Sequence, residues 1–409
     1  MSDTEQTMEN EPPTTSPTEE QESPSVATTS DESRSILTVD GLTKIYPDGT
    51  LAVDDIDFDV KAGDFCVIIG PSGCGKSTTL HSLVGKVEPT EGTVELAGRD
   101  ITDAQTYDRD IGLVFQDFQL FPHLTVEENI RYGMERAGLP EDEINSRLDD
   151  IVETMRLGES RTRDPMELSA GQKQRVALAR SLVLEPKLLL LDEPLGDMDY
   201  KLQKHMEKEL LRIHREFDTT FVYVTHDQTQ AMRLADQVIV MNDGQIEQAE
   251  SVNRTYNNPA TAFVATFVGD SNILSGIATE ASVDGNRIEM DTDLGPFTSS
   301  TDNLDTTAEE AVGKEMSFCV RPQHLSLSAD SENTIECRVD DIITHASQGT
   351  QVLLNPLVDE SRELQLLSRE LITDLDETVT ISWEPSDAVL LERTSVVDDV
   401  DLQKDVLGE

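Results

Sequence analysis

The sequence predicts an α/β domain with a largely parallel sheet, followed by a smaller all-β domain. The first observation is that short apolar runs of strand character alternate with helical stretches from Ile36 to about Gly269. The second is a change of pattern from about Ser271 onward, where helical stretches largely disappear and short segments alternate apolar with polar residues. We therefore expect residues 36–270 to form one domain and residues 271–395 the other.

The expected elements follow in chain order. The first strand is predicted at Ile36–Val39, and five further apolar runs of strand character follow: Phe65–Ile69, Ile111–Phe115, Leu188–Leu191, Thr220–Thr225 and Gln237–Met241. Helical stretches are predicted at Val126–Ala137, Ala170–Leu184 and Tyr200–Phe217; the last mixes both charge signs, as a solvated helix does. In the second domain, alternating segments at Glu315–Val320, Thr334–Val339 and Thr378–Trp383 predict a small barrel.

The two ends of the chain are predicted to be tails. Residues 1–35 consist largely of Ser, Thr, Pro and Glu with few large apolar side chains, so we expect a disordered acidic tail. Residues 396–409 are expected to form a second acidic tail.

The charge is strongly one-sided. The net charge is −49, from 81 acidic and 32 basic residues, and only 11 of the basic residues are lysine. This balance argues against a nucleic acid as partner. Residues 1–35 hold only nine of the acids, so the excess is spread over the folded part. Because the Debye length falls to about 3 Å at molar salt, such a surface indicates adaptation to concentrated salt, and we expect a halophilic archaeal source.

Cysteine usage and hydropathy bear on location. Cys66, Cys74, Cys319 and Cys337 form no CxxC pair and no metal-ligand spacing, which favours a reduced cytosolic compartment. No apolar run of about 18 residues and no secretory signal is present, so we expect any work at a membrane to depend on partner chains.

The segment from Gly70 to Thr78 fits a phosphate-binding loop, with Gly70, Gly75, Lys76 and Ser77 at the constrained positions. An apolar run precedes it and a helix-compatible stretch follows. Backbone N–H groups and the helix N-terminus would surround phosphates, Lys76 would reach the β- and γ-phosphates, and Ser77 would ligate magnesium. The alternative is a simple Gly-rich turn. The sequence thus predicts a P-loop NTPase that binds a nucleoside triphosphate through Gly70, Pro71, Ser72, Gly73, Cys74, Gly75, Lys76, Ser77 and Thr78.

Two further motifs carry chemistry. The leucine-rich run before Pro194 ends in Asp192 and Glu193, at the strand end where ligands gather in open α/β sheets. Asp192 would hold magnesium, usually through water, and Glu193 would polarise the attacking water; the alternative is a chance acidic turn. Ser169 begins the motif Ser-Ala-Gly-Gln before a helix, which reads as an ordinary N-cap, as an anion site, or as both.

Taken together, the phosphate-binding loop, Leu-Ser-Ala-Gly-Gln and Leu-Leu-Leu-Leu-Asp-Glu-Pro resemble the nucleotide-binding subunits of ABC transporters over residues 36–270. The resemblance implies that Gln116 senses magnesium and the permease, that His226 contacts the γ-phosphate, and that Tyr46 stacks on adenine. It also implies that Ser169, Gly171 and Gln172 act at the γ-phosphate of a second subunit and that Asp199 crosses the dimer interface.

Two positions depart from the family pattern. Ala170 stands where the family most often has glycine, and Leu195-Gly196-Asp197-Met198 stands where related importers carry a serine-containing loop. Alanine is small, so we expect activity to survive the first change, and the second change keeps the terminal aspartate, Asp199.

The C-terminal region resembles the small β-barrel extension of many importer ATPases, called TOBE and related to the oligonucleotide-binding fold. The residues that carry this resemblance are Phe318–Leu325 and Ile381–Val389. In that family the extension dimerises or senses regulators, and a purely stabilising dimer module is the alternative.

The resemblance implies an ATP- and magnesium-dependent head-to-tail homodimer that encloses two ATP molecules on the cytoplasmic face of the membrane. Its partners would be two permease subunits and, through them, an extracellular substrate-binding protein.

The segment Asp117–Val126 resembles the corresponding segment in the ATPases of importers for polyamines, ferric iron, thiamine or sulfate and molybdate. Sugar importers tend to have tyrosine in place of Phe121. The alternatives are a sugar-type importer and a non-transport ATPase acting in DNA repair or on ribosomes.

Overall fold

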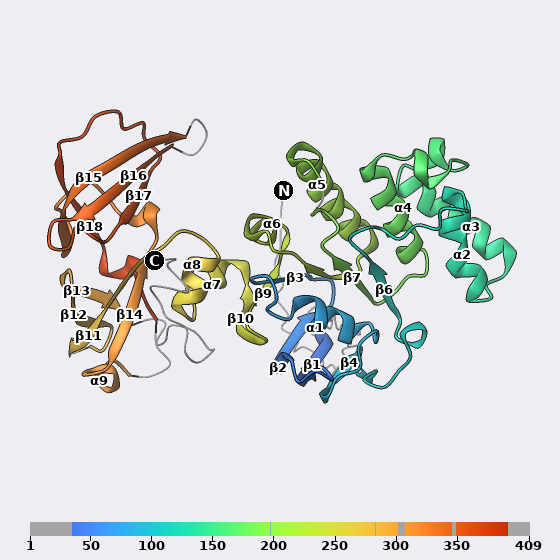
Figure 1. Cartoon of the computed structure of the whole chain (residues 1–409), viewed down its shortest axis with the longest axis horizontal. Helices are drawn as coiled ribbons and strands as arrows, with labels where there is room; N and C mark the ends of the chain where they lie inside the picture. The colour runs from blue at the N-terminus through green and yellow to red at the C-terminus, as the bar shows by residue number, and fades with distance from the viewer. Residues whose placement is uncertain (1–34, 197, 283, 302–306, 346–348, 392–409) are drawn as a thin grey trace, which may run out of the picture.

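The computed structural model describes residues 35–196, 198–282, 284–301, 307–345 and 349–391 (Figure 1). Except for Ser35, the tails expected at residues 1–35 and 396–409 lie outside the described residues. The strands up to residue 251 and the helices around them form one region, and the strands from residue 272 form a second, joined to the first near α7 and α8 (Figure 1).

The central sheet of the first region has six strands in the order β10-β9-β3-β8-β7-β6. The pairs β3/β8, β3/β9, β6/β7 and β7/β8 are parallel, and β10 pairs antiparallel with β9. Buried apolar runs such as those of β3 and β8 are typical of a parallel sheet covered on both faces. The strands are β3 Phe65–Ile69, β6 Ile111–Val114, β7 Leu188–Asp192, β8 Thr220–Val224, β9 Gln237–Asn242 and β10 Gln245–Ser251.

An antiparallel sheet, order β2-β1-β4-β5, packs against one face of the central sheet. It comprises β1 Ser35–Ile45, β2 Leu51–Lys61, β4 Glu91–Leu96 and β5 Arg99–Asp100. Apolar side chains of this sheet, among them Leu37, Val53 and Val94, share a core with Ile68 of β3 and Leu80 of the following helix. Strand β1 is longer than expected and β2 was not expected, because aspartates on its solvent face interrupt the apolar pattern.

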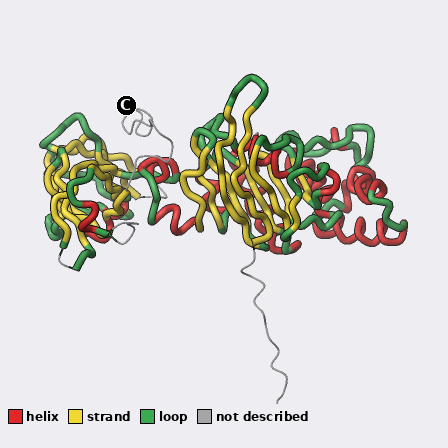
Figure 2. Tube along the Cα trace, turned by 90° about the horizontal axis from the view of Figure 1, so that it is seen from below, coloured by secondary structure: helices red, strands yellow, loops and turns green. Residues whose placement is uncertain are grey.

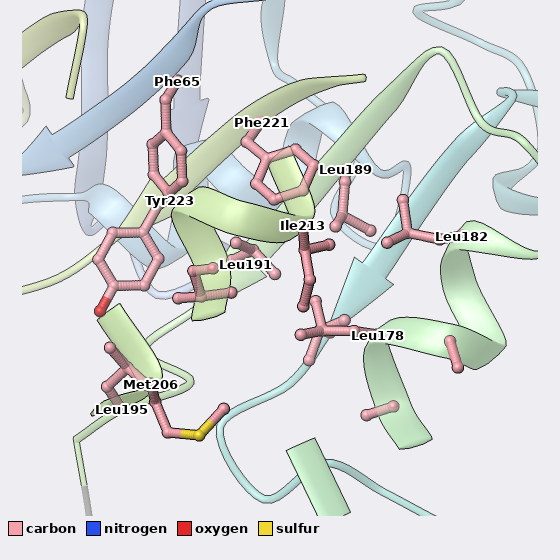
Figure 3. Close-up of a cluster of buried hydrophobic side chains, with 14 of the residues drawn as sticks. Phe65, Leu178, Leu182, Leu189, Leu191, Leu195, Met206, Ile213, Phe221 and Tyr223 are labelled. Atoms are coloured by element: carbon pink, nitrogen blue, oxygen red, sulfur yellow. The ribbon is translucent and has the colours of Figure 1, made fainter. Parts of the chain in front are cut away.

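Helices cover the other face of the central sheet, and Figure 2 shows this region's strands between a lobe of helices and the second region. In Figure 3, Leu178 and Leu182 of α4 and Met206 and Ile213 of α5 pack with strand side chains such as Leu191. Helix α5 therefore has one buried face, which includes Met206, Leu210 and Ile213. The helices are α1 Lys76–Leu83, α2 Val126–Arg136, α3 Glu141–Thr154, α4 Ala170–Leu182, α5 Tyr200–Phe217, α6 Gln228–Leu234, α7 Val252–Asn257 and α8 Ala262–Phe267.

The second region contains a closed barrel, β11-β12-β13-β19-β14, and also a four-stranded sheet, β17-β16-β15-β18. The sequence predicted one barrel, but both sheets contribute to a single core around Phe297, Phe318 and Trp383. The elements are β11 Asn272–Ala281, β12 Arg287–Thr292, β13 Gly295–Ser300, α9 Ala308–Ala311, β14 Glu315–Val320, β15 Asn333–His345, β16 Gly349–Pro356, β17 Leu364–Ser368, β18 Thr378–Trp383 and β19 Ala388–Leu391.

Arg321 fastens the junction between the two regions. It follows β14, is 4% exposed, and donates hydrogen bonds to the carbonyls of Tyr256, Ala265, Gly269 and Asp270. Its guanidinium also lies 4.2 Å from the centroid of the Tyr256 ring. A buried charge needs such hydrogen bonds, so this cation fixes the end of the first region to the second.

Candidate functional site

The loop between β3 and α1 is tightly packed at its two ends. A Cβ on Gly70 would lie 2.2 Å from the carbonyl oxygen of Met241, and one on Gly75 would lie 2.5 Å from that of Ala52. Gly75 also has a φ of 101° and forms the N-cap of α1. These positions therefore require glycine, and the loop presents the N-terminus of α1 toward its own concave side.

Lys76 occupies the inside of this loop. Its ammonium donates hydrogen bonds to the carbonyl oxygens of Gly70 and Pro71, each at 2.7 Å, and its side chain is 6% exposed. Ser72, Gly73 and Ser77 are exposed on the loop. Cys74 is buried 3.7 Å from the ammonium nitrogen, and burial raises the pKa of its thiol. The result is a held cation beside exposed backbone N–H and hydroxyl groups, which suits an anionic phosphate chain.

Tyr46 lies beside the first turn of α1. It sits in the turn between β1 and β2, and its hydroxyl is 3.4 Å from the Thr78 hydroxyl. The half-buried ring therefore borders the loop at the position where a planar base can stack.

Asp192 ends β7 and faces α1. Its carboxylate is 3.7 Å from Nε2 of His81, which lies one helical turn after Ser77 and so on the same face of α1. Burial raises the pKa of the Asp192 carboxyl, and burial lowers the pKa of His81. The sequence analysis missed His81, although its i+4 spacing from Ser77 could have indicated it.

Glu193 has a left-handed backbone, with a φ of 44°. Its N–H donates to the carbonyl of Val224 at the end of β8, and its Oε2 is 3.1 Å from Nδ1 of His226. Non-glycine residues rarely adopt this conformation unless their surroundings impose it. The strain directs the Glu193 carboxylate toward His226 at the carboxyl ends of the strands.

Gln116, which follows β6, reaches the same place. A Cβ built on Gly196 would lie 3.5 Å from Nε2 of Gln116 and 3.7 Å from Oε2 of Glu193. The amide and the carboxylate therefore converge over Gly196. The structure brings together Gln116, Asp192, Glu193 and His226 from three neighbouring parallel strands.

Ser169 and Gln172 form a reciprocal cap at the start of α4. The Ser169 hydroxyl accepts from the Gln172 N–H, and Oε1 of Gln172 accepts from the Ser169 N–H at 3.0 Å. Gly171 is buried, and a Cβ there would lie 3.1 Å from Sδ of Met206 on α5. Ala170 is exposed. This turn therefore presents a capped helix N-terminus to solvent.

Asp199 caps α5, accepting from the N–H groups of Lys201 and Leu202, each at 3.1 Å. Within the part of the chain that the structure describes, no hydrogen bond or ion pair joins Ser169, Gly171, Gln172 or Asp199 to the loop Gly70–Thr78. The predicted site residues thus fall into two separate groups within one chain.

A cleft of about 610 Å³ lies between α2, α4 and the segment before β6. Tyr107, which lines it, is 84% exposed. Its other lining residues include Leu113, Phe121, Tyr132, Arg136 and Arg180. The sequence analysis singled out the segment Asp117–Val126 but did not predict a cleft, because the aromatic rings that form it come from distant parts of the chain.

The donor set fits a magnesium ion bound together with phosphates. Among the residues that the structure describes, no group of three or more His, Cys, Asp or Glu side chains is arranged to hold a metal. The hydroxyl of Ser77, the amide of Gln116 and the carboxylate of Asp192 are hard oxygen ligands, which Mg²⁺ prefers, and Mg²⁺ commonly takes its remaining ligands from phosphates and water.

Comparisons with known proteins agree with this geometry. Residues 53–196 match the ABC transporter family, and residues 318–391 match the TOBE domain family. The chain is 38% identical over 378 residues to the spermidine/putrescine import ATP-binding protein PotA of Thermobifida fusca, covering 90% of this chain and 96% of that protein.

Two further similarities cover smaller shares of the chain. The chain is 43% identical over 288 residues to the sn-glycerol-3-phosphate import ATP-binding protein UgpC of Rhodopseudomonas palustris, covering 66% of this chain and 79% of that protein. The solved structure of cbiO1 from Clostridium perfringens, part of the ABC transporter complex cbiONQ, matches with a TM-score of 0.50 at 32% identity, covering 54% of this chain and 90% of that chain.

Fold and site together define an ATP-binding P-loop ATPase, which confirms the predicted fold class of an ABC ATPase domain followed by a small all-β domain. More specifically, the chain belongs to the ATP-binding subunits of ABC transporters and carries a C-terminal TOBE domain. It is the ATP-hydrolysing subunit of an importer and works with membrane permease components. No helix among the described residues is long and apolar enough to cross a membrane.

Proposed function

We propose that the first group of site residues binds and hydrolyses Mg-ATP, and that the second completes the site of another copy. The observation that carries the proposal is the 3.1 Å contact between Glu193 and His226 at the sheet edge that also bears the phosphate-binding loop. In parallel sheets the strand ends where ligands bind lie on one edge.

The nucleotide would lie along the loop Gly70–Thr78. The N–H groups of Gly73 to Thr78 and the Lys76 ammonium would bind its phosphates, while the Tyr46 ring would stack on adenine. For Lys76 this requires exchanging two carbonyl acceptors for phosphate oxygens, a favourable exchange because charge-assisted bonds to an anion are stronger.

Ser77, Gln116 and Asp192 would hold magnesium. When bound, the ion neutralises phosphate charge that develops during transfer. Burial raises the pKa of the Asp192 carboxyl, and a bound cation would oppose this effect because it favours the charged form. His81 would help to orient the Asp192 carboxylate from the same face of α1 as Ser77.

Glu193 would take a proton from the attacking water, and His226 would orient Glu193 and contact the γ-phosphate. Hydrolysis depends mainly on positioning and charge stabilisation, since the protein forms no covalent intermediate. The left-handed backbone of Glu193 supports this role because it fixes the direction of the carboxylate.

A second copy would supply Ser169, Gly171 and Gln172 to the γ-phosphate and Asp199 to the interface between subunits. The separation of these residues from the phosphate-binding loop of their own chain supports this arrangement, as does the solvent-facing N-terminus of α4. A head-to-tail homodimer would then enclose two ATP molecules, with closure driven by nucleotide binding and opening by hydrolysis.

The experiment that tests the catalytic role is Glu193→Gln in the complex with its permease. We expect hydrolysis to fall by about 10²–10⁴-fold with ATP binding retained, because the amide cannot accept the proton. Glu185→Gln is the matched control: Glu185 also has a positive φ and precedes β7, but its side chain is 71% exposed and pairs with Arg147. Full hydrolysis by Glu193→Gln contradicts the role.

In each copy, the cleft lined by Tyr107, Phe121 and Tyr132 would receive a segment of one of the two permease subunits, which would place the dimer at the cytoplasmic face of the membrane. The exposed ring of Tyr107 and the half-buried rings of Phe121 and Tyr132 line this hollow, and aromatic rings around a hollow are typical of binding surfaces, which supports this assignment. Tyr107→Arg should abolish co-purification of the permease while ATP binding persists; unchanged co-purification would refute this docking site.

The transported substrate would be a polyamine delivered by an extracellular binding protein. In support, the relatives whose names include spermidine and putrescine are similar over nearly the full chain, including the Thermobifida protein at 90% of this chain. A glycerol phosphate or sugar importer is the second candidate, favoured by the higher identity of the Rhodopseudomonas protein over a shorter stretch. Reconstituted vesicles that take up labelled spermidine, with no effect of excess glycerol 3-phosphate, would support the polyamine. Uptake of labelled glycerol 3-phosphate but not of spermidine would contradict it.

We also propose that the domain boundary lies at residue 270, with residues 36–270 as the ATPase domain and residues 271–395 as the TOBE-like domain.

We further propose a halophilic archaeal source, which the net charge of −49 supports. Circular dichroism on dialysis from molar to dilute salt should show loss of structure, because repulsion between carboxylates is then unscreened. An unchanged spectrum would contradict adaptation to salt.

A further inference from the structure

The loop that follows Gln116 has an uncommon backbone. Phe118 and Gln119 are consecutive non-glycine residues with φ values of 61° and 41°. The Phe118 N–H donates to the Phe115 carbonyl at 3.0 Å, and the Gln119 N–H donates to the Asp117 carbonyl at 2.8 Å. Left-handed residues rarely occur in succession in L-amino-acid chains, so this turn has to be held by its neighbours.

Arg180 holds the turn from α4. Its Nη1 donates to the carbonyl of Gln119 at 2.8 Å and its Nη2 to that of Phe118 at 3.1 Å. The guanidinium also lies 5.3 Å from the centroid of the Phe121 ring. A planar guanidinium can bind two adjacent carbonyls at once, which an ammonium group cannot do with the same geometry.

Arg180 also lacks a carboxylate partner, which most of the described surface arginines have. Arg147 and Arg161 each pair with carboxylates, whereas no described carboxylate lies within 4 Å of the Arg180 guanidinium. Among the described residues, its hydrogen bonds go only to the two carbonyls of the turn. The cation therefore serves the backbone of this loop and not a surface ion pair.

The next part of the same loop is held separately. Asn129 of α2 is fully buried; its amide donates to the carbonyls of Phe121, Leu124 and Thr125, and its Oδ1 accepts from the Phe121 N–H. The loop is thus bound to α2 from Phe121 onward, and to α4 at Phe118 and Gln119. Only Asp117 lies between Gln116 and the turn bound by Arg180.

Resting on the proposed role of Gln116, we propose that Arg180 is a positioning residue whose two hydrogen bonds to the Phe118–Gln119 turn place the Gln116 amide beside Glu193 and the magnesium site. Because α4 begins at the Ser169 cap, Arg180 also links the surface offered to the second copy with the loop that carries Gln116. A change in the position of α4 would move both together.

The test compares Arg180→Lys and Arg180→Ala in the full chain. Lysine keeps the positive charge but has a single nitrogen, so it lacks the rigid fork by which Nη1 and Nη2 hold one carbonyl each. We expect the half-saturating Mg²⁺ concentration for fluorescent ATP-analogue binding to rise about tenfold, the scale seen when residues supporting a metal ligand are lost. Binding of the analogue in EDTA should be unchanged, which a general loss of structure would not allow. Arg180→Lys serves as the readout if Arg180→Ala does not fold.

Arg147→Lys is the matched control. Arg147 lies on α3 and donates to the carbonyl of Val183 just after α4, but it does not contact the loop after Gln116. We expect wild-type dependence on Mg²⁺ for this variant. An equal shift in Arg147→Lys, or a wild-type response in Arg180→Lys, overturns the assignment of Arg180.

Gln116→Ala separates this inference from the proposed function. If Gln116→Ala leaves the dependence on Mg²⁺ unchanged, the role of Gln116 fails and the role of Arg180 fails with it. If Gln116→Ala shifts the dependence while Arg180→Lys does not, only the Arg180 inference fails. In the double variant, Arg180→Lys should add less than about twofold to the effect of Gln116→Ala, since coupled residues are not additive; a full multiplicative effect overturns the inference.

Discussion

The two regions differ in how much backbone strain they hold. All the described non-glycine residues with a positive φ lie between Asp55 and Asp243, and none lies in the described part of residues 272–391. Phe118, Gln119 and Glu193 are among them and lie at the candidate site. The ATPase region therefore has left-handed non-glycine residues at the candidate site as well as in turns elsewhere, whereas only glycines adopt a positive φ in the described part of the TOBE region.

Both regions use cations in two ways, to bind backbone carbonyls and to form ion pairs. In the ATPase region, Lys76, Arg109 and Arg180 donate to backbone carbonyls; Arg109 alone binds those of Ser82, Leu83, Thr102 and Ala104. In the TOBE region, Arg321 does the same at the junction with the ATPase region, while Arg287 and Arg338 pair with exposed carboxylates. Cations bound to carbonyls hold loops in fixed conformations, while exposed ion pairs contribute little to stability. The comparison predicts that function in one region depends on single polar groups and that stability in the other depends on its apolar core.

Of the variants that compare the two regions, Lys76→Ala in the ATPase region has the largest expected effect. Loss of the ammonium removes a donor to the transferring phosphate, so we expect hydrolysis to fall by about 10²–10³-fold. Steady-state ATPase assays in molar salt measure this. The control is Lys187→Ala, a half-exposed lysine 3.8 Å from Asp110, which should keep full activity. Comparable losses in both variants would mean that general charge, and not the loop, is responsible.

Trp383→Ala should damage the TOBE region alone. The side chain is 2% exposed, and its ring centroid lies 4.9 Å from that of Phe297. Removing such a ring from a core costs about 3–5 kcal/mol of unfolding free energy. Denaturant unfolding followed by far-UV circular dichroism should show this loss, while ATP binding changes less than about twofold.

The control for Trp383→Ala is Leu371→Ala, whose side chain is 73% exposed and should be replaceable at no measurable cost. If Trp383→Ala abolishes ATP binding at temperatures where the ATPase region stays folded, the two regions are not separable in the way the comparison predicts.

A smaller effect is expected from His214, which packs edge-on against Phe65 and Phe221 at centroid distances of 5.3 and 5.0 Å. Burial lowers the pKa of His214, although Asp236 and Asp218 oppose this. The unfolded chain therefore binds more protons, and stability falls as the pH drops below the unfolded value of about 6.5. His214→Phe should flatten the dependence of the ATPase-region melting temperature on pH between about 7 and 5.

The TOBE region provides the internal control for His214. Its buried titratable groups include two thiols, and burial raises the pKa of Cys319 to about 11 and that of Cys337 to about 12. These thiols stay neutral between about pH 7 and 5, and because His214 lies in α5, outside the TOBE region, His214→Phe should leave the TOBE melting temperature unchanged. An unaltered slope for the ATPase region would show that other groups dominate its acid sensitivity.

The sequence predicted most of the parallel strands and the candidate site because buried parallel strands are continuous apolar runs and phosphate-binding motifs are local. It did not predict β2, because aspartates alternate with the buried residues of this strand. It also did not predict α3, because charged residues outnumber its four buried apolar side chains. His81 and Arg180 were also missed. Each acts on residues far away in the chain, so only the tertiary fold brings their partners within reach.

The central claim is that one copy's phosphate-binding loop faces the Ser169 turn of another copy. The most direct measurement is cross-linking of Ser72→Cys with Ala170→Cys in a Glu193→Gln background, since both positions are exposed. With a short bifunctional thiol reagent, the account predicts covalent dimers on a non-reducing gel in Mg-ATP and few in ADP. Monomers alone in Mg-ATP, from protein shown to bind the nucleotide, would contradict it.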